Sequence, residues 1–153
     1  LNNIKNITTI PDALGSEENK LTLHINRNNV AGSSFVNTES NEAISVNVKT
    51  LDSYNYEKVK FIKIDVEGFE YNVLLGGEKT ISRDHPKILF EYSPVYYRKY
   101  NESHILEIVY FFKKHHYRLI DLEDKRKSIH STQDFVKEFG DGLRSQTNIL
   151  ALP

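Results

Sequence analysis

The chain has 153 residues and a formal net charge of -1, and 39% of its residues are hydrophobic. This length and composition fit one globular domain with its own core, and they exclude a disordered chain. The near-neutral charge argues against a protein held on nucleic acid by bulk positive charge. The chain has no cysteine, which excludes disulfides, thiolate metal sites and cysteine nucleophiles. It also has no methionine, which indicates a piece of a longer protein.

Membrane and nucleic-acid partners are not expected. No apolar run approaches the ~20 residues that a membrane-spanning helix needs, and the N-terminus has no secretory signal. The basic runs Lys113-Lys114 and Lys125-Arg126-Lys127 are too short for a nucleic-acid footprint. We therefore expect a cytoplasmic protein without a membrane span.

The first part of the chain, residues 1–58, has the pattern of short strands and loops. Ile7–Ile10 is rich in β-branched residues, whereas Leu21–Ile25 and Ile44–Val48 alternate apolar and polar residues. The polar stretch 26–41 is typical of a loop. We expect half-buried strands here, in an antiparallel pair or at the edge of a sheet.

Residues 59–153 alternate between apolar strands and amphipathic helices. The predicted strands are Phe61–Asp65, Lys87–Glu91, Tyr117–Asp121 and Asn148–Leu152. The predicted helices are Phe69–Ser82, which Gly76-Gly77 interrupts, and Ser103–His115. The alternation predicts β-α-β units, and the continuous apolar strands predict a sheet covered on both faces. The expected fold class is therefore α/β.

Three of these strands end in an acidic residue, namely Asp65, Glu91 and Asp121. Ligands of open α/β sheets bind beyond the carboxyl ends of the strands, so these carboxylates would lie at the rim of a ligand site. An acid at a strand end can also open a loop or cap a helix. We prefer that interpretation for Asp121, and both stay open for Glu91.

The densest signal is the segment Asp65-Val66-Glu67-Gly68-Phe69-Glu70. Gly68 permits a tight turn or the close approach of a ligand. Glu67 and Glu70 precede or begin the next helix, whose dipole stabilises acids at its N-terminus. An Asp-x-Glu pair can also bind a cation or accept a proton from a hydroxyl group. The residues alone leave the structural and the functional role open.

The same segment carries a resemblance to a known family. Lys63–Glu70 has the pattern K-x-D-x-E-G-x-E, and Val73-Leu74 with Gly76 and then Pro86–Glu91 follow it. In this order the three blocks resemble the FkbM family of S-adenosylmethionine-dependent methyltransferases. Weaker similarities lie upstream in Asp12-Ala13-Leu14-Gly15, Gly32-Ser33-Ser34 and Val48-Lys49-Thr50-Leu51-Asp52. The resemblance runs from about Ile7 to Leu152.

The resemblance implies a Rossmann-like class I methyltransferase fold with a mostly parallel sheet. It implies O-methyl transfer from S-adenosylmethionine to a hydroxyl group of a sugar or other small metabolite. Asp65 and Glu67 would lie near the transferred methyl group as candidate bases, and Asp12, Ala13 and Leu14 would lie beside the adenine. The candidate substrate contacts are Glu91, Tyr92 and Tyr96, and no metal site is expected.

The chain departs from the family pattern at its start. Family members begin with a strand and a Gly-rich cofactor loop, followed by a strand that ends in an acid for the ribose. We find neither, and we interpret Gly140-Asp141-Gly142 as a turn. We therefore expect a partial domain, with a strand-and-loop segment over 1–58 and an alternating segment over 59–153, and the rest of the parent polypeptide as its partner. Alone, it should expose one side of its sheet and bind the cofactor weakly or not at all.

Two other functions stay open. The chain could be a non-catalytic Rossmann-like interaction module that keeps the sheet without the cofactor site. It could also be a cation-dependent transferase or hydrolase with Asp65, Glu67 and Glu91 as ligands. His115-His116 ends a helix, and we interpret it as a favourable partner of the helix dipole because it has no metal-ligating partner at i, i+4.

Overall fold

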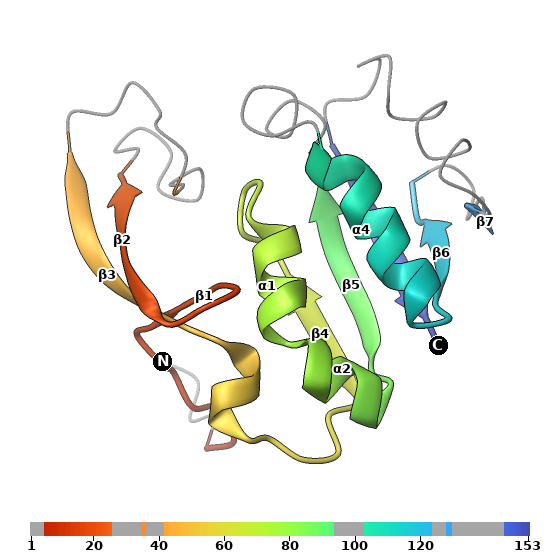
Figure 1. Cartoon of the computed structure of the whole chain (residues 1–153), viewed down its shortest axis with the longest axis horizontal. Coiled ribbons are helices and arrows are strands. Elements are labelled where there is room, and N and C mark those ends of the chain that lie inside the picture. The colour runs from red at the N-terminus through yellow and green to blue at the C-terminus, as the bar shows by residue number, and fades with distance from the viewer. Residues whose placement is uncertain (1–4, 26–34, 36–41, 94–102, 124–127, 130–145) are drawn as a thin grey trace.

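The computed structural model describes residues 5–25, 35, 42–93, 103–123, 128–129 and 146–153 (Figure 1). The strands are β1 (Ala13–Leu14), β2 (Asn19–His24), β3 (Ala43–Lys49), β4 (Phe61–Ile64), β5 (Lys87–Tyr92), β6 (Arg118–Asp121), β7 (Ser128–Ile129) and β8 (Thr147–Leu152). The helices are the short 3-10 helix η2 (Leu51–Tyr54) and the α-helices α1 (Glu70–Gly76), α2 (Glu78–Asp84) and α4 (Ser103–Lys114). The α/β class is confirmed, and the predicted helix 69–82 is divided in two at Gly77.

A five-stranded sheet in the order β4-β5-β8-β6-β7 forms the larger half of the structure. Among its described pairings only β4 with β5 is parallel, while β8 runs antiparallel to both β5 and β6. The expectation of a mostly parallel sheet is therefore wrong for the described strands. The reason lies at the last strand: the start of β8 lies beside the end of β6, where Asp121 pairs with Ile149, so β8 must run in the opposite direction.

The three α-helices cover one face of this sheet (Figure 1). Neighbouring strands place buried side chains in one row on that face, where Ile64 pairs with Phe90 and Phe90 pairs with Ile149. These side chains pack against helix residues such as Leu74 and Phe112 in a single hydrophobic core. Since a fully buried side chain of this size stabilises the fold by ~1.5–3 kcal/mol, this layer holds the larger half together.

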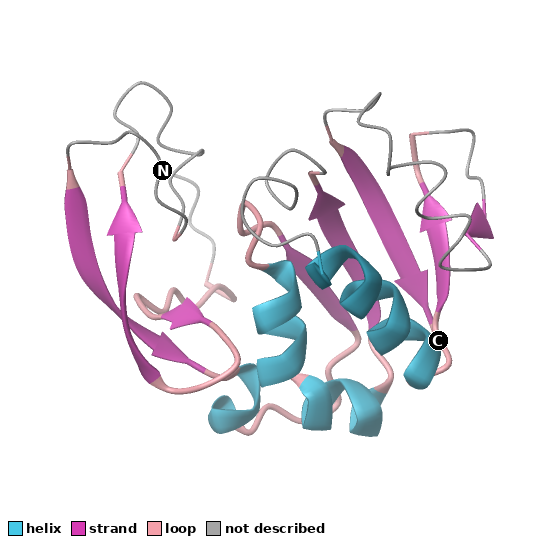
Figure 2. Ribbon diagram, turned by 45° about the horizontal axis from the view of Figure 1, so that its top comes forward, coloured by secondary structure: helices cyan, strands magenta, loops and turns pink. Residues whose placement is uncertain are grey.

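The opposite face of the sheet carries no described helix (Figure 2). Its row of paired residues is Lys63, Leu89, Leu150 and Ile120, and each of these is only partly buried or exposed. At the start of β4, Phe61 is 54% exposed. The prediction of a sheet covered on both faces is therefore not met by the described helices, and the expected exposure of one side stays a prediction.

A second sheet has the order β1-β3-β2, with β1 parallel and β2 antiparallel to β3. The strands expected at 21–25 and 44–48 are confirmed as β2 and β3. The strand expected at Ile7–Ile10 is not formed, because this segment has no strand partner among the described residues, and Ile7 and Ile10 are exposed.

Two glycines and an aspartate join the small sheet to the helices. A Cβ atom at Gly76 would lie 1.9 Å from the carbonyl oxygen of Gly15, so the end of α1 approaches the residue after β1 at backbone distance. The Asp52 carboxylate accepts hydrogen bonds from the backbone N–H groups of Lys79 and Thr80 and from the Thr80 hydroxyl, at 2.7–3.1 Å. Asp52 thus caps the N-terminus of α2 from a distant part of the chain.

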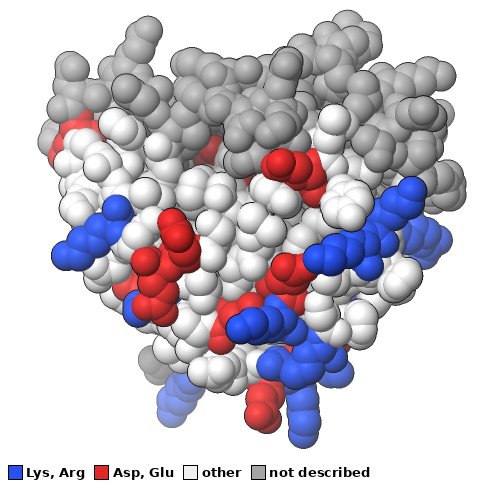
Figure 3. Space-filling model, viewed as in Figure 1, with Lys and Arg blue, Asp and Glu red and all other residues white. Residues whose placement is uncertain are grey.

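No helix in the described part of the chain is long and apolar enough to cross a membrane. Basic and acidic side chains are interspersed on the face that Figure 3 shows.

Candidate functional site

The turn that follows β4 has an unusual backbone. Phe69 N–H donates a hydrogen bond to the carbonyl oxygen of Val66 at 3.3 Å, and φ is 50° at Glu67 and 94° at Gly68. Two positive φ angles in succession are the mark of a type I′ turn, which favours Asn-Gly or Gly-Gly. Gly68 is suited to it, but a left-handed Glu67 costs ~1–2 kcal/mol. Strain of this kind concentrates at functional sites.

A buried carboxylate holds this turn in place. Glu70 is only 2% exposed, and its Oε1 accepts a hydrogen bond from Gly68 N–H at 3.1 Å. Glu70 also begins α1, where the positive end of the helix dipole favours an acid. Glu70 therefore helps to hold the turn through its hydrogen bond with Gly68.

Three carboxylates meet where β4 and β5 end. Burial raises the pKa of Glu91, and the charges of Asp65 and Glu67 raise it further, while Lys63 opposes them. Two of the three strand-end acids that the sequence marked as a possible rim, Asp65 and Glu91, thus interact, with Glu67 in place of Asp121; Asp65, Glu67 and Glu91 are called the acid rim below. Glu91 lies in the same row as Leu89, on the face that carries no described helix.

Lys63 and Asp65 form an ion pair beside this rim. Their Nζ and Oδ2 atoms are 2.5 Å apart, and the side chains are 52% and 41% exposed. Residues two apart on a strand project to the same side, so the K-x-D spacing explains the contact. The hydrogen bond to Asp65 raises the pKa of the Lys63 ammonium, so this ammonium stays charged at neutral pH.

Asp12 belongs to a different cluster. Its Oδ2 accepts a hydrogen bond from the Tyr54 hydroxyl at 3.0 Å, and the Tyr54 ring stacks on Tyr56 with 5.7 Å between centroids. Burial raises the pKa of Tyr54, and the bond to Asp12 raises it further. Nearby, Leu14 is half-buried against the hydrophobic core. No contact in the described part of the chain joins this cluster directly to Asp65 or Glu91.

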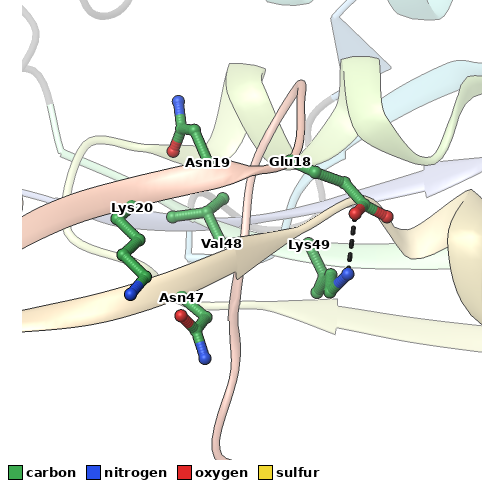
Figure 4. A pocket seen from close by; sticks show the side chains of 6 residues that line it. All are labelled: Glu18, Asn19, Lys20, Asn47, Val48 and Lys49. Atoms are coloured by element: carbon green, nitrogen blue, oxygen red, sulfur yellow. Dashed lines mark hydrogen bonds and ion pairs between the residues drawn. The ribbon is translucent and has the colours of Figure 1, made fainter.

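A shallow hollow of about 440 Å³ lies over β2 and β3. In Figure 4, Asn19 and Lys20 point in opposite directions from their strand, and Glu18 and Lys49 are joined at 2.7 Å. The polar side chains that line this hollow therefore do not converge on one point. None of the acid-rim residues lines it.

The described residues contain no group of three or more His, Asp or Glu side chains arranged to hold a metal ion. The carboxylates of the acid rim thus interact electrostatically, but they are not arranged as a metal-binding cluster.

Comparison with known proteins identifies the family. Residues 2–119, more than half of the chain, match the sequence model of the Methyltransferase FkbM domain. The chain belongs to the FkbM methyltransferase family. No curated protein and no solved structure matches the chain. The matched region contains both the Asp12 cluster and the acid rim, and it ends within β6, short of the end at Leu152 that the resemblance suggested.

The structure gives four of the FkbM motif residues, Gly15, Leu51, Asp52 and Gly76, a structural role. Gly76 of the V-L-x-G block meets Gly15, the last residue of the Asp12–Gly15 segment. Asp52, at the end of the Val48–Asp52 segment, caps α2. The neighbouring Leu51 side chain packs closely against Gly77, because a Cβ at Gly77 would lie 2.9 Å from Leu51 Cδ2. These motif residues join the small sheet and η2 to the helices α1 and α2.

The remaining predicted contacts have different outcomes. Tyr92 follows Glu91 on β5, so its side chain points to the opposite face, where it is fully buried in the core. The two residues therefore do not face one side of the sheet. Tyr96 lies outside the described residues. Asp121 accepts hydrogen bonds from Glu123 N–H and the Thr147 hydroxyl at 2.9 and 2.7 Å, which fits the loop-opening role preferred for it.

The residues near Asp12 fit the adenine end of an FkbM cofactor. Among the described residues Tyr54 occupies Oδ2 of Asp12, and Oδ1 accepts no hydrogen bond. A carboxylate oxygen of this kind can accept the amino group of adenine, and the half-buried Leu14 offers an apolar surface for a ring. The Asp12 carboxylate as an acceptor and the apolar Leu14 side chain therefore have the chemistry that an adenine ring needs.

Sequence reasoning did not predict the contacts that three residues make, namely Lys63, Glu70 and Tyr54. Lys63 could have been found, because the spacing of two on a strand predicts its contact with Asp65. Glu70 carried a weak signal as an acid at a helix start. Tyr54 carried none, because its partner Asp12 is 42 positions away in the chain.

Proposed function

We propose that this chain takes part in S-adenosylmethionine-dependent O-methyl transfer to a hydroxyl group of a sugar or other small metabolite. Membership of the FkbM methyltransferase family supports the reaction class. The observation that carries the proposal is the strained turn that sets Glu67 beside Asp65 and Glu91 at the ends of β4 and β5. This is the edge at which open α/β sheets bind their ligands.

The chemistry assigned to the acids is removal of the hydroxyl proton. When bound, the cofactor supplies a methyl group that its sulfonium has already activated. Asp65 or Glu67 accepts the proton, which is worth ~10²–10⁴-fold in rate. Lys63 holds the Asp65 carboxylate in one place, and the raised pKa of Glu91 makes it a better hydrogen-bond partner for an acceptor hydroxyl. Alignment of the acceptor oxygen would supply up to ~7–11 kcal/mol more.

Asp12, Ala13 and Leu14 would hold the adenine end of the cofactor. Asp12 would accept the adenine amino group through Oδ1, while Tyr54 fixes the carboxylate through Oδ2. Leu14 would pack on the ring from its half-buried position on β1. Glu91 and Tyr96 remain the proposed substrate contacts, since Tyr92 is buried in the core.

We further propose that the chain is the later part of a methyltransferase domain, with segments 1–58 and 59–153, and that the rest of the parent polypeptide completes it. The face without a described helix supports this, because Lys63 and Glu91 lie in the rows of that face. A segment that covered it would close the acid rim from one side. A cytoplasmic location is part of the proposal, since no cysteine is available for the disulfides common in secreted domains.

The test is a methyl-transfer assay on the full-length parent with a panel of glycans and hydroxylated metabolites. Asp65→Asn and Glu67→Gln are compared with Glu18→Gln, a carboxylate on the small sheet that pairs with Lys49. We expect the base variant to lose at least ~10²-fold in kcat and the control to lose nothing. Full turnover by both Asp65→Asn and Glu67→Gln would overturn the assignment of the base.

Two further measurements address the other parts of the proposal. Turnover that stops on addition of a chelator would replace the proton-transfer role of the acids with cation binding. Tight S-adenosylmethionine binding by the 153-residue chain alone, measured by calorimetry, would contradict the partial domain.

A further inference from the structure

Three side chains from α2 and the end of α4 form a hydrogen-bonded chain. Ser82 Oγ lies 3.1 Å from His115 Nδ1, and His115 Nε2 lies 2.9 Å from Glu78 Oε1. Ser82 is exposed, whereas the His115 side chain is 11% exposed and the Glu78 side chain 33%. A hydroxyl, an imidazole and a carboxylate in hydrogen-bond sequence are the arrangement that activates a serine nucleophile.

The electrostatics give the imidazole the required orientation. The hydrogen bond from Lys114 holds the pKa of Glu78 below its ordinary value, and the bond from His115 lowers it further. Glu78 is therefore ionised at neutral pH and accepts the Nε2–H of His115. In the neutral imidazole the lone pair then lies on Nδ1, which faces the Ser82 hydroxyl. The order of roles is that of a serine–histidine–acid triad, with the two ring nitrogens exchanged.

A purely structural role accounts for only part of this arrangement. Glu78 begins α2 and both Lys114 and His115 lie at the end of α4, so their contacts at 2.8 and 2.9 Å hold the two helices together. His115 is further fixed against the ring of Phe111, with 4.6 Å between centroids. The Ser82 hydroxyl adds one more hydrogen bond between the same helices, but it is exposed and therefore also accessible to a reagent.

We propose that Ser82 is a nucleophile that is acylated by activated esters, with His115 as its general base and Glu78 as the positioning residue. Ser82 Oγ forms a bond to the acyl carbon, and the bond between that carbon and the leaving alkoxide or phenolate breaks. The hydroxyl proton passes to His115 Nδ1 and then to the leaving group. Lys79 lies three residues earlier on α2, a spacing that places it on the same side of the helix as Ser82. This site is separate from the acid rim and does not depend on the proposed methyl transfer.

The experiment incubates the 153-residue chain with p-nitrophenyl acetate and follows both p-nitrophenolate release and the site of acetylation. Trypsin cleaves after Lys79 and Arg83 and releases residues 80–83, which contain no lysine. In this peptide Ser82 is exposed, whereas Thr80 is 2% exposed. Peptide mass spectrometry therefore distinguishes acetylation of Ser82 from acetylation of the many surface lysines.

We expect acetylation of residues 80–83 to disappear in Ser82→Ala and to slow at least ~10-fold in His115→Gln. Ser45→Ala, an exposed serine on β3, should leave it unchanged. Thermal unfolding of each variant, followed by circular dichroism, checks that the fold is kept. An unmodified 80–83 peptide in the wild-type chain, or an equal rate in His115→Gln, would overturn the proposal.

Glu78 needs a control that separates positioning from structural support. Lys114→Ala removes the other partner of Glu78 without touching His115 or Ser82. If Glu78 orients the imidazole, Glu78→Gln slows acetylation several-fold more than Lys114→Ala does, whatever the two variants do to the melting temperature. Equal slowing in both variants would limit Glu78 to holding the helices together.

Discussion

The contact between Gly15 and Gly76 makes a sharp prediction for Gly76→Ala. The new Cβ would lie 1.9 Å from the Gly15 carbonyl oxygen, 2.9 Å from its carbonyl carbon and 3.4 Å from Thr50 Cα. All three are backbone atoms, so no side-chain rotation relieves the clash. To reach ordinary carbon contact distances, α1 or the end of β1 must move by roughly 1.5 Å.

The expected loss of stability follows from two opposing effects. Inserting a methyl group into a packed region costs ~1–3 kcal/mol, and an immovable backbone places Gly76→Ala at the upper end. Alanine gains up to ~1 kcal/mol over glycine inside a helix, but Gly76 is the last residue of α1, so only part of this gain applies. The free energy of unfolding should therefore fall by about 2 kcal/mol, and the melting temperature by about 4–8 °C.

Urea unfolding followed by far-ultraviolet circular dichroism measures this change. The midpoint should fall while the slope m stays the same. Gly77→Ala is the matched control, because its Cβ would meet the flexible end of Leu51 at 2.9 Å, and it should cost less than ~1 kcal/mol. If Gly76→Ala is as stable as the wild type, the backbone contact between the two motif glycines does not exist as described.

Three other predictions concern single side chains. Asp52→Ala removes the cap of α2 and the partner of the buried Thr80 hydroxyl, so thermal unfolding should show a loss of ~1–3 kcal/mol. Glu67→Asn creates an Asn-Gly turn with Gly68 and should raise stability in urea by up to ~1 kcal/mol, while turnover of the parent enzyme falls if Glu67 is the base. The raised pKa of Glu91 means that the folded state binds this proton more tightly than the unfolded state, so stability falls as the pH rises above about 4.5. Glu91→Gln should therefore unfold at a higher temperature than the wild type at pH 7, and the difference should vanish below pH 4.5.

Each of these predictions has a result that contradicts it. Asp52→Asn keeps an oxygen acceptor, so an equal loss in Asp52→Asn and Asp52→Ala would mean that capping is not the cause. A loss of stability in Glu67→Asn would show that the side-chain contacts of Glu67 outweigh the backbone strain. For Glu91→Gln, a melting temperature below that of the wild type at pH 7 would mean that the ionised carboxylate is well solvated or paired.

Local sequence patterns predicted most of the elements, because strand alternation and helical periodicity depend on neighbouring residues. The segments expected at 61–65, 87–91 and 148–152 are strands, and the helix expected from Ser103 ends at Lys114. The expectations that needed partners were less successful. Ile7–Ile10 has strand composition but finds no strand partner in the described part of the chain, and the direction of β8 depends on where the chain re-enters the sheet.

The sequence by itself determined the α/β class, the family resemblance and the acid block Asp65–Glu70, because all three are written in short, contiguous patterns. Only the tertiary structure decided which acids interact and which motif residues hold the fold. Glu91 lies beside Asp65 because β4 and β5 pair, and Gly15 meets Gly76 because α1 packs against the small sheet. The Ser82–His115–Glu78 chain likewise joins residues that are 33 and 37 positions apart in the sequence. Such contacts depend on packing between distant segments, which local composition and periodicity do not encode.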